Sequence, residues 1–440
     1  MRAFAEELLK TALELGCDAA ETCVDESNSF RVKVLEGELD AYQVSQKIGV
    51  GLRVVVAGKN GYAYTQAAED AKSLVLRAMD NAKTVESEDE HPMQTKQNYV
   101  EVTPPACPLC DLSNEEKIDI ARRMETMAKQ MDARVFQTPH CVVSTTTFAR
   151  HLQNTLGLDA SMQTQNGAIM LQAAMKEGDE IHEGFAFRDS EDALDIDGCV
   201  AEAVKKAADQ FGAASYTSGK TAVVLDRDAA CDLLGAFSSM FCADMAQKGM
   251  SPLAKKLGEK IAADIVSIVD DPLYEKDPHA FDGEGTPSVK TSVVQQGVFQ
   301  SFLHNLKTAK KDGVLSTSNA GRASAASPVS VSPCNFYILP GEKTQDELLE
   351  ELGNGLLICE VSGLHAGLNA VTGDFSLLAS GYVVKDGKRD RAVEQVTVAG
   401  NFLSLLMDIR AIACDLYFGM SPVGTPSLLV ENLTIAGSET

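Results

Sequence analysis

The chain has 440 residues, and its 63 acidic side chains outnumber its 39 basic ones, which gives a formal net charge of −24. This balance argues against general nucleic-acid binding and against docking on an anionic membrane, because both need basic surfaces. Single hydrophobic cores stop growing near ~250–300 residues, so we expect two or three domains. No apolar run approaches the ~18 residues that cross a bilayer, and the N-terminus lacks a signal-peptide pattern, so we expect a cytoplasmic protein.

The first 85 residues alternate between helical and strand-like patterns. Apolar spacing predicts an amphipathic helix over residues 1–16. Alternating polar and apolar runs follow, with a turn at residues 58–61, and helical spacing returns over residues 68–85. Residues 1–85 are therefore expected to form an N-terminal α+β domain.

Residues 86–112 are first acidic and then proline-rich, which is typical of a linker. Cys107 and Cys110 have the spacing of a metal-binding pair, but a zinc ribbon needs a second such pair or nearby histidines. The 11 cysteines are odd in number and scattered, which argues against a disulfide framework. We therefore expect a linker that contains two thiols.

A central α+β domain is expected over residues 113–218. Ser113 and Glu116 match a capping box at the start of a helix, strand-like runs follow, and a helix over residues 195–214 closes the domain.

Residues 219–440 are richer in strands and glycine and are expected to form a C-terminal domain. Hairpin signals occur at residues 295–297 and at Asp386-Gly387. The expected fold class is α+β, with mostly antiparallel sheets and flanking helices.

Few motifs in the chain carry chemistry. Phosphate-binding glycine loops and the G-x-S-x-G elbow are absent from the sequence, and its seven histidines are too scattered for a zincin helix. Residues 231–245 predict a helix whose apolar stripe suits core packing. Ser239 and Cys242 on this helix are nucleophile candidates by residue type alone.

Several segments, taken in order and spacing, resemble the TldD/PmbA family, whose members are also named candidate modulators of DNA gyrase. The resemblance covers nearly the whole chain. The segments that carry it are "IGVGLRVVVAGKNGYAYT", "GKTAVVLDRDAACDLLGAF", "FDGEGTPSVKTSVVQQGVFQSFLHNLKTAKK", "SPCNFYILPGEKTQDELL", "NAVTGDFSLLASGYVVKDG", "VEQVTVAGNF" and "VENLTIAG".

The resemblance implies a peptidase system with two kinds of subunit. TldD-type subunits carry a His-Glu-x-x-x-His helix and a later cysteine that bind the catalytic metal, whereas PmbA (TldE) subunits lack these ligands and pair with a TldD subunit. In this chain the three helix positions are occupied by Leu234, Gly235 and Ser239, and the segment 416–432, where the cysteine is expected, has none. We therefore expect no catalytic residue, metal or cofactor in this chain, and zinc in a TldD-type partner.

The expected function is that of a non-catalytic subunit that shapes the peptide chamber beside such a partner, with unfolded peptides as substrates. Two turns are expected to border the chamber: one contains Asp282, Glu284, Gly285 and Thr286, and the other Thr372, Gly373 and Asp374. One alternative is a self-sufficient thiol-dependent hydrolase that uses Cys242 or another thiol. The other is a homodimeric peptide-binding protein without peptidase activity.

Overall fold

The computed structural model describes residues 1–68, 70–84 and 91–437, which divide into two compact units. Unit 1 contains Met1–Phe211, Glu275–Pro287 and Arg322–Val329, and unit 2 contains the remaining described residues. The expected α+β class is confirmed, with a strand-rich C-terminal part. Residues 86–90 of the expected linker, and the ends of the expected helix at positions 69 and 85, lie outside the described residues.

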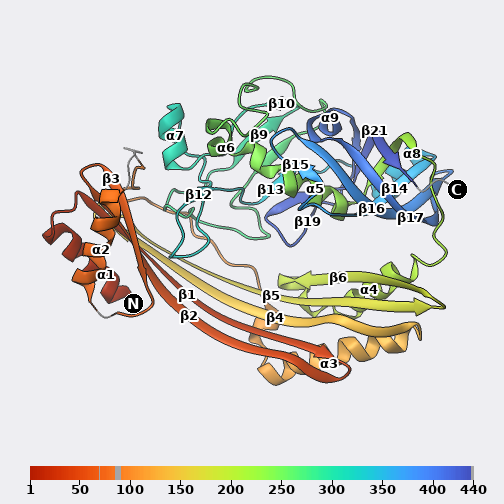
Figure 1. The fold of residues 1–440 in the computed structure, drawn as a ribbon, viewed down its shortest axis with the longest axis horizontal. Helices are drawn as coiled ribbons and strands as arrows, with labels where there is room; N and C mark the ends of the chain where they lie inside the picture. Colours follow the sequence, from red (N-terminus) through yellow and green to blue (C-terminus); the bar gives the residue numbers. More distant parts are fainter. Residues whose placement is uncertain (69, 85–90, 438–440) are drawn as a thin grey trace. The chain divides into compact units, whose positions relative to one another are not determined.

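Unit 1 is built on a six-stranded antiparallel sheet with the order β3-β2-β1-β4-β5-β6 (Figure 1). Helices α1 and α2 pack on β1–β3 at one end, and α3 and α4 pack on β4–β6 toward the other. Its elements are α1 (Arg2–Glu14), β1 (Ala19–Leu35), β2 (Glu38–Val56), β3 (Lys59–Thr65), α2 (Ala71–Thr84), the 3-10 helix η1 (Pro108–Asp111), α3 (Asn114–Met131), β4 (Val135–Asn154), β5 (Asp159–Glu177), β6 (Glu180–Asp189), η2 (Ser190–Leu194) and α4 (Ile196–Ala208).

The local patterns noted in residues 1–85 and 113–218 also explain the elements that these residues contribute to unit 1. Phe4, Leu8 and Ala12 are buried on the inner face of α1, as the apolar spacing indicated. The Ser113 hydroxyl accepts a hydrogen bond from the Glu116 N–H, and the Glu116 carboxylate accepts one from the Ser113 N–H, so the capping box is confirmed.

Unit 2 contains two larger sheets and a β-ribbon. One sheet has the order β10-β9-β8-β13-β20-β19, and the other has the order β14-β7-β21-β17-β16-β15, with β18 paired to β21. Most pairs are antiparallel, while β13–β20 and β14–β7 are parallel. The elements are β7 (Gly219–Leu225), α5 (Arg227–Phe237), η3 (Ser238–Phe241), α6 (Ala243–Gln247), β8 (Ile268–Asp270), β9 (Thr291–Gln295), β10 (Val298–Phe299), α7 (Leu306–Asp312), β11 (Ala320–Gly321), β12 (Ser330–Val331), β13 (Phe336–Ile338), α8 (Gln345–Leu352), β14 (Gly355–Ser362), β15 (Leu368–Asn369), β16 (Asp374–Lys385), β17 (Lys388–Asn401), α9 (Phe402–Met407), β18 (Ile409–Ile412), β19 (Tyr417–Phe418), β20 (Val423–Thr425) and β21 (Leu428–Ala436).

Both predicted hairpins of unit 2 are confirmed. Gln296 and Gly297 join β9 to β10, and Asp386 and Gly387 join β16 to β17. All four residues have φ between 47° and 79°, the left-handed conformation that two-residue hairpin turns require.

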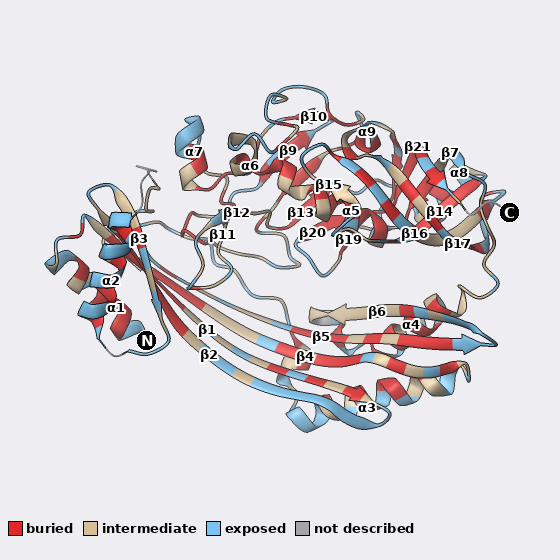
Figure 2. Ribbon diagram, in the orientation of Figure 1, coloured by how far each residue is buried: buried red, intermediate tan, exposed pale blue. Residues whose placement is uncertain are grey.

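Each of the two units buries its own set of residues (Figure 2). Each unit has its own buried apolar clusters, and the largest cluster of unit 2 joins α5 to both larger sheets. The first part of β2 is exposed on both faces, and it includes Leu39, Tyr42 and Val44. Among the described residues, no helix is long and apolar enough to cross a membrane.

Candidate functional site

Helix α5, the helix that the family pattern assigns to the metal, is part of the core of unit 2. The Asp226 carboxylate caps its first turn by accepting a hydrogen bond from the Asp228 N–H. All five side chains of the predicted apolar stripe are buried, so its packing role is confirmed; they are Leu233, Leu234, Phe237, Met240 and Phe241.

The helix is shorter than the sequence predicted. We expected one helix over residues 231–245, but α5 ends at Phe237 and Cys242 has an extended conformation. The Leu303 N–H donates to the Phe241 carbonyl at 2.9 Å, and the Ala243 N–H donates to the Leu303 carbonyl at 2.9 Å. This strand-like pairing uses main-chain groups that a continuous helix would need, so a tertiary contact overrides the local helical pattern.

The three positions where the metal ligands are expected hold no suitable set of donors. Leu234 is apolar and 1% exposed, Gly235 has no side chain, and Ser239 offers one half-buried hydroxyl. Zinc sites use thiolate, imidazole and carboxylate ligands. These residues therefore do not fit a zinc ion, and the described part of the chain contains no cluster of three or more His, Cys, Asp or Glu side chains placed to bind a metal.

The segment where the late cysteine is expected lies beside these positions. A Cβ atom added to Gly235 would lie 3.9 Å from Ser421 Oγ, in the turn between β19 and β20. The Cys231 thiol contacts the same hairpin, because it accepts a hydrogen bond from the Thr425 N–H at 3.2 Å. Helix α5 and the hairpin of β19 and β20 therefore lie side by side. Gly235 and Ser421, which face each other there, offer no thiolate, imidazole or carboxylate ligand.

The buried thiols near α5 are poor nucleophiles. Burial, and to a lesser degree the carboxylates of Asp244 and Asp270, raises the pKa of Cys242 to about 12. Burial raises the pKa of Cys231 to about 11 despite hydrogen bonds from Thr425. Both thiols are therefore protonated at neutral pH, whereas nucleophilic cysteines react as thiolates.

The predicted turn with Thr372, Gly373 and Asp374 lies near the end of helix α5. The Asn401 side-chain amide donates to the Thr372 carbonyl at 2.9 Å and to the Asp374 carboxylate at 3.0 Å. The Asn401 bond, and then one with Thr372, lower the pKa of Asp374. A Cβ atom added to Gly373 would lie 3.4 Å from Met240 Cε, so the turn lies beside η3.

The other predicted turn, which contains Asp282 and Thr286, belongs to unit 1. Its Asp282 carboxylate accepts hydrogen bonds from the N–H groups of Glu284 and Thr286, both at 2.9 Å. Gly285 has φ +78°, and a Cβ there would meet Leu158 at 2.8 Å, so this position requires glycine.

Buried polar side chains hold this acidic turn in unit 1. Glu284 is 1% exposed and its carboxylate contacts the His91 imidazole, while the Tyr99 hydroxyl donates to the Gly285 carbonyl at 2.8 Å. Arg322 donates to the Gly283 carbonyl and forms a buried ion pair with Glu21 at 2.8 Å. The two predicted turns therefore belong to different units, and the acidic one is largely an internal support.

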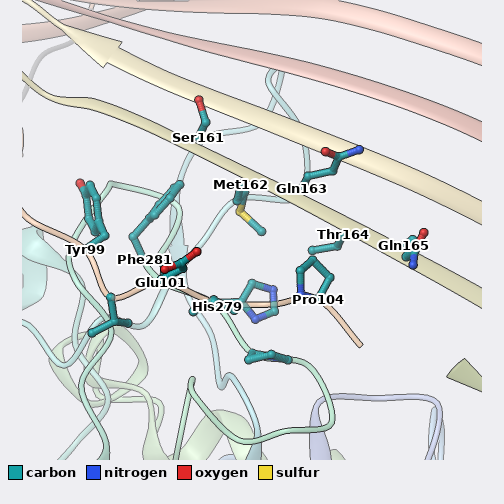
Figure 3. A pocket seen from close by; sticks show the side chains of 14 residues that line it. Tyr99, Glu101, Pro104, Ser161, Met162, Gln163, Thr164, Gln165, His279 and Phe281 are labelled. Atoms are coloured by element: carbon teal, nitrogen blue, oxygen red, sulfur yellow. The ribbon is translucent and has the colours of Figure 1, made fainter. Parts of the chain in front are cut away.

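A groove that the sequence did not predict is lined by Phe281, the residue directly before the acidic turn (Figure 3). It has a volume of about 570 Å³. One wall is the first half of β5, and the other is formed by an extended segment over residues 99–104 and a loop over residues 278–281. We call this site the β5 groove. The polar run "SMQTQ" marks the wall in the sequence, but it is indistinguishable there from an ordinary exposed strand.

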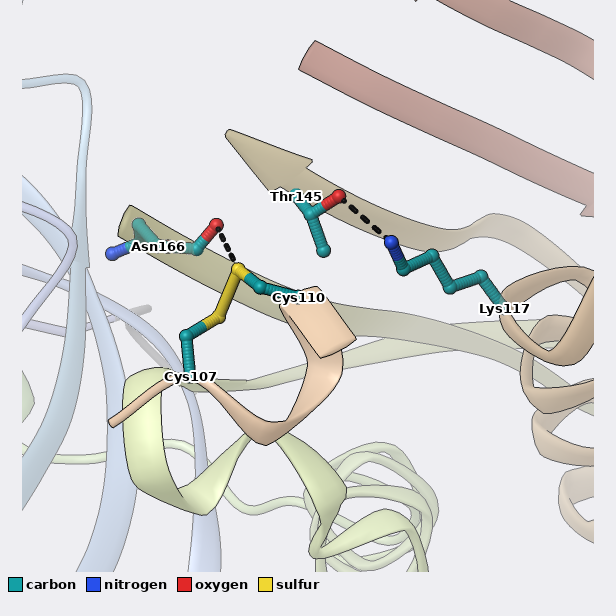
Figure 4. Close-up of a disulfide and its surroundings, with 5 residues drawn as sticks. All are labelled: Cys107, Cys110, Lys117, Thr145 and Asn166. Carbon is teal, nitrogen blue, oxygen red and sulfur yellow. Dashed lines mark hydrogen bonds between the residues drawn. A yellow bond between two sulfur atoms is a disulfide. The ribbon is translucent and has the colours of Figure 1, made fainter. Parts of the chain in front are cut away.

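The two cysteines of the expected linker form a disulfide (Figure 4), and it lies at Asn166 of β5, directly after the groove-lining residues 161–165. Cys107 is 2% exposed, and Cys110 Sγ lies 3.5 Å from the Asn166 carbonyl oxygen on β5. A Cβ atom added to Gly167 would lie 2.9 Å from Cys107 Sγ, so glycine makes room for the bond. The interpretation of these cysteines as two thiols was therefore wrong.

The sequence matches three family models that together cover most of the chain. Residues 20–82 match PmbA/TldA metallopeptidase domain 1, residues 107–211 match the central domain, and residues 218–437 match the C-terminal domain. An uncharacterised protein of Methanocaldococcus jannaschii is 30% identical over 394 residues, which cover 87% of this chain and 88% of that protein. Metalloprotease PmbA of Escherichia coli O157:H7 is 23% identical over 448 residues, which cover 99% of this chain and 97% of that protein.

Solved structures have the same fold over nearly the full length. A candidate modulator of a DNA gyrase from Thermotoga maritima superposes with a TM-score of 0.92 at 32% identity, covering 99% of this chain and 100% of that chain. TldE from Thermococcus kodakarensis superposes with a TM-score of 0.90 at 22% identity over the same shares of the two chains. With the three family models matched in order and this fold shared end to end, the chain belongs to the PmbA/TldD metallopeptidase family.

Proposed function

We propose that this chain is a non-catalytic subunit of the PmbA (TldE) type, which works in the cytoplasm beside a zinc-bearing TldD-type partner. The pair would process or degrade unfolded peptides. The observation that carries the proposal is the set of residues at the three expected ligand positions: Leu234 and Gly235 in the last turn of α5 and Ser239 just beyond it offer no set of zinc ligands. Zinc in such a system would activate water and polarise the scissile carbonyl, and here those tasks are assigned to the partner.

Several features of this chain suit a supporting role. The turn with Thr372 and Asp374 lies beside the end of α5, where it could border a peptide chamber within unit 2. The exposed apolar side chains of β2 offer surface for a subunit contact. The high pKa values of the buried Cys231 and Cys242 thiols argue against a self-sufficient hydrolase that uses either of these two thiols.

Metal analysis and a reconstituted peptidase assay test the proposal. The purified chain is analysed for zinc by mass spectrometry, and cleavage of fluorescently labelled, denatured casein is measured with this chain, with a TldD-type subunit from the native host, and with both. We expect substoichiometric zinc on this chain and substantial cleavage by the mixture only.

Three outcomes would contradict it. Stoichiometric zinc bound by this chain alone, or cleavage by this chain alone, would show a catalytic subunit. A mixture no more active than the TldD-type subunit, together with a stable homodimer of this chain, would favour a peptide-binding protein without peptidase function. Cys242→Ala serves as the control, and we expect the activity of the mixture to be unchanged.

A further inference from the structure

We propose that the β5 groove is a binding site for an extended peptide segment of about five residues, held by main-chain pairing with the open edge of β5. The inference rests on the proposed function only in the class of ligand, a peptide. The site lies entirely within unit 1 and does not involve helix α5.

The first half of β5 has a free edge. The strand pairs with β4 from Asp159 to Met175, but with β6 only from Ala168 to Glu177. In the described part of the chain, residues 159–167 therefore have a strand neighbour on one side only. Alternate residues of a strand direct their N–H and C=O groups to the same side, so this edge offers unpaired donors and acceptors. An added strand is the ligand that satisfies such an edge.

The groove keeps this edge open. Residues 99–104 form the opposite wall, yet within the described residues no main-chain hydrogen bond joins them to residues 161–165. The opposite wall is anchored at Tyr99, whose ring lies 4.9 Å from that of Phe281 and whose hydroxyl donates to the Gly285 carbonyl. Because this wall is anchored at Tyr99 and does not pair with the edge of β5, the groove between them leaves space for a separate chain.

Both ends of the groove are defined. Tyr99 and Phe281 occupy one end, and the disulfide-closed turn of Cys107 and Cys110 covers β5 at Asn166 and Gly167 at the other. The lining residues of β5 run from 161 to 165. At about 3.3 Å per residue, this length accepts an extended segment of about five residues.

The lining suits peptides of varied sequence. The β5 wall carries hydroxyl, amide and thioether groups, with Ser161, Met162 and Gln163 among them (Figure 3). Glu101 is the one carboxylate among the described residues that line the groove, and the chain carries a net charge of −24. Main-chain pairing is independent of side chains, so we expect broad tolerance with a preference for basic over acidic peptides.

Peptide binding to the full chain, without any partner, tests the site. The probe is fluorescein-labelled Ala-Lys-Ala-Lys-Ala amide, with fluorescence anisotropy as the readout. A peptide of the same sequence with every amide N-methylated cannot donate main-chain hydrogen bonds, and we expect it to bind at least about tenfold more weakly. Hydrogen exchange of β5 is expected to slow at residues 161–165 when the unmethylated peptide binds.

Two variants locate the site. Gln163→Trp fills the groove and is expected to weaken binding at least about tenfold. Gln43→Trp, on the exposed part of β2, makes the same exchange elsewhere in the sheet and should leave binding unchanged. Circular dichroism spectra establish that both variants are folded.

Three results would overturn the proposal: no binding of the probe to the wild-type chain, equal binding of the N-methylated peptide, or equal loss of binding in both variants. Since the assay uses neither zinc nor a partner, it stays informative if the reconstituted peptidase assay fails. Equally, the chain can prove to be a non-catalytic subunit while this groove binds nothing.

Discussion

The buried Asp270 carboxyl group makes the stability of unit 2 depend on pH. Asp270 ends β8 and is 0% exposed. Its carboxylate accepts hydrogen bonds from the Cys334 N–H at 2.7 Å and from the Asn319 amide at 2.9 Å. Burial outweighs these bonds and raises the pKa of Asp270 from 3.8 to about 7.

Proton linkage gives the sign and the size of this change in the free energy of unfolding. A carboxyl group with a raised pKa binds its proton more tightly in the folded state, so its contribution to stability is complete below pH 3.8 and is lost as pH rises to about 7. Each pH unit in that window is worth about 1.4 kcal/mol, which gives about 4 kcal/mol in total. Between pH 5 and pH 8 the loss is about 3 kcal/mol.

Asp270→Asn removes this titration while retaining one acceptor. We expect the wild-type chain to lose about 3 kcal/mol more than Asp270→Asn between pH 5 and pH 8, measured by urea unfolding followed with circular dichroism. Asp264→Asn, whose side chain is 80% exposed, is the control and should follow the wild type. Infrared difference spectra between the two pH values provide a second readout, since the protonated carboxyl band of Asp270 should be absent from Asp270→Asn.

Parallel pH dependence of the wild type and Asp270→Asn between pH 5 and pH 8 would refute the reasoning. It would mean that Asp270 is ionised throughout the range, so its two hydrogen bonds would outweigh the cost of burial.

Three further predictions concern packing, charge and thiol reactivity. Gly167→Ala should destabilise unit 1 by about 1–3 kcal/mol in urea unfolding, because the new Cβ would lie 2.9 Å from Cys107 Sγ. Gly235→Ala is the control and should not destabilise the chain, because its new Cβ has no contact closer than 3.9 Å. Equal effects of the two substitutions would contradict the packing argument. Glu21→Gln should cost about 3–5 kcal/mol by leaving buried Arg322 without its charged partner, and a melting temperature within error of the wild type would count against this pairing. Ellman's reagent should modify exposed Cys414 rapidly in the folded chain and Cys242 only after unfolding; rapid reaction of Cys242, checked by peptide mapping, would reopen the thiol-hydrolase alternative.

The parts of the fold that the sequence predicted depend on local rules. The Ser113 capping box and the turn at Asp386 and Gly387 each involve residues within four positions of one another. The end of α5 was not predictable in this way, because it depends on pairing with Leu303, more than sixty residues along the chain. The pattern near Phe237 stays helical in the sequence, and only the tertiary contact overrides it.

The candidate sites also differ in whether a pattern in the sequence could locate them. The family pattern located Leu234, Gly235 and Ser239, and the structure places the first in the core. The β5 groove was not predictable, because it arises where β6 stops at Asp189 while β5 extends further, and where Tyr99 packs against Phe281. Strand length mismatches and long-range wall contacts leave no local signal in the sequence.

The segments Glu275–Pro287 and Arg322–Val329 set the order in which unit 1 can be completed during synthesis. Glu21 and Arg322 are 301 residues apart, so Glu21 leaves the ribosome long before Arg322, its ion-pair partner, has been synthesised. Residues 1–211 can form helices and the long hairpins early, but the buried ion pair of Glu21 can form only after Arg322 has emerged. In a nascent chain stalled at residue 211, Glu21 and the surface that later contacts the acidic turn would therefore be exposed to solvent and chaperones. A gene fragment that ends at this residue would encode an incomplete unit 1.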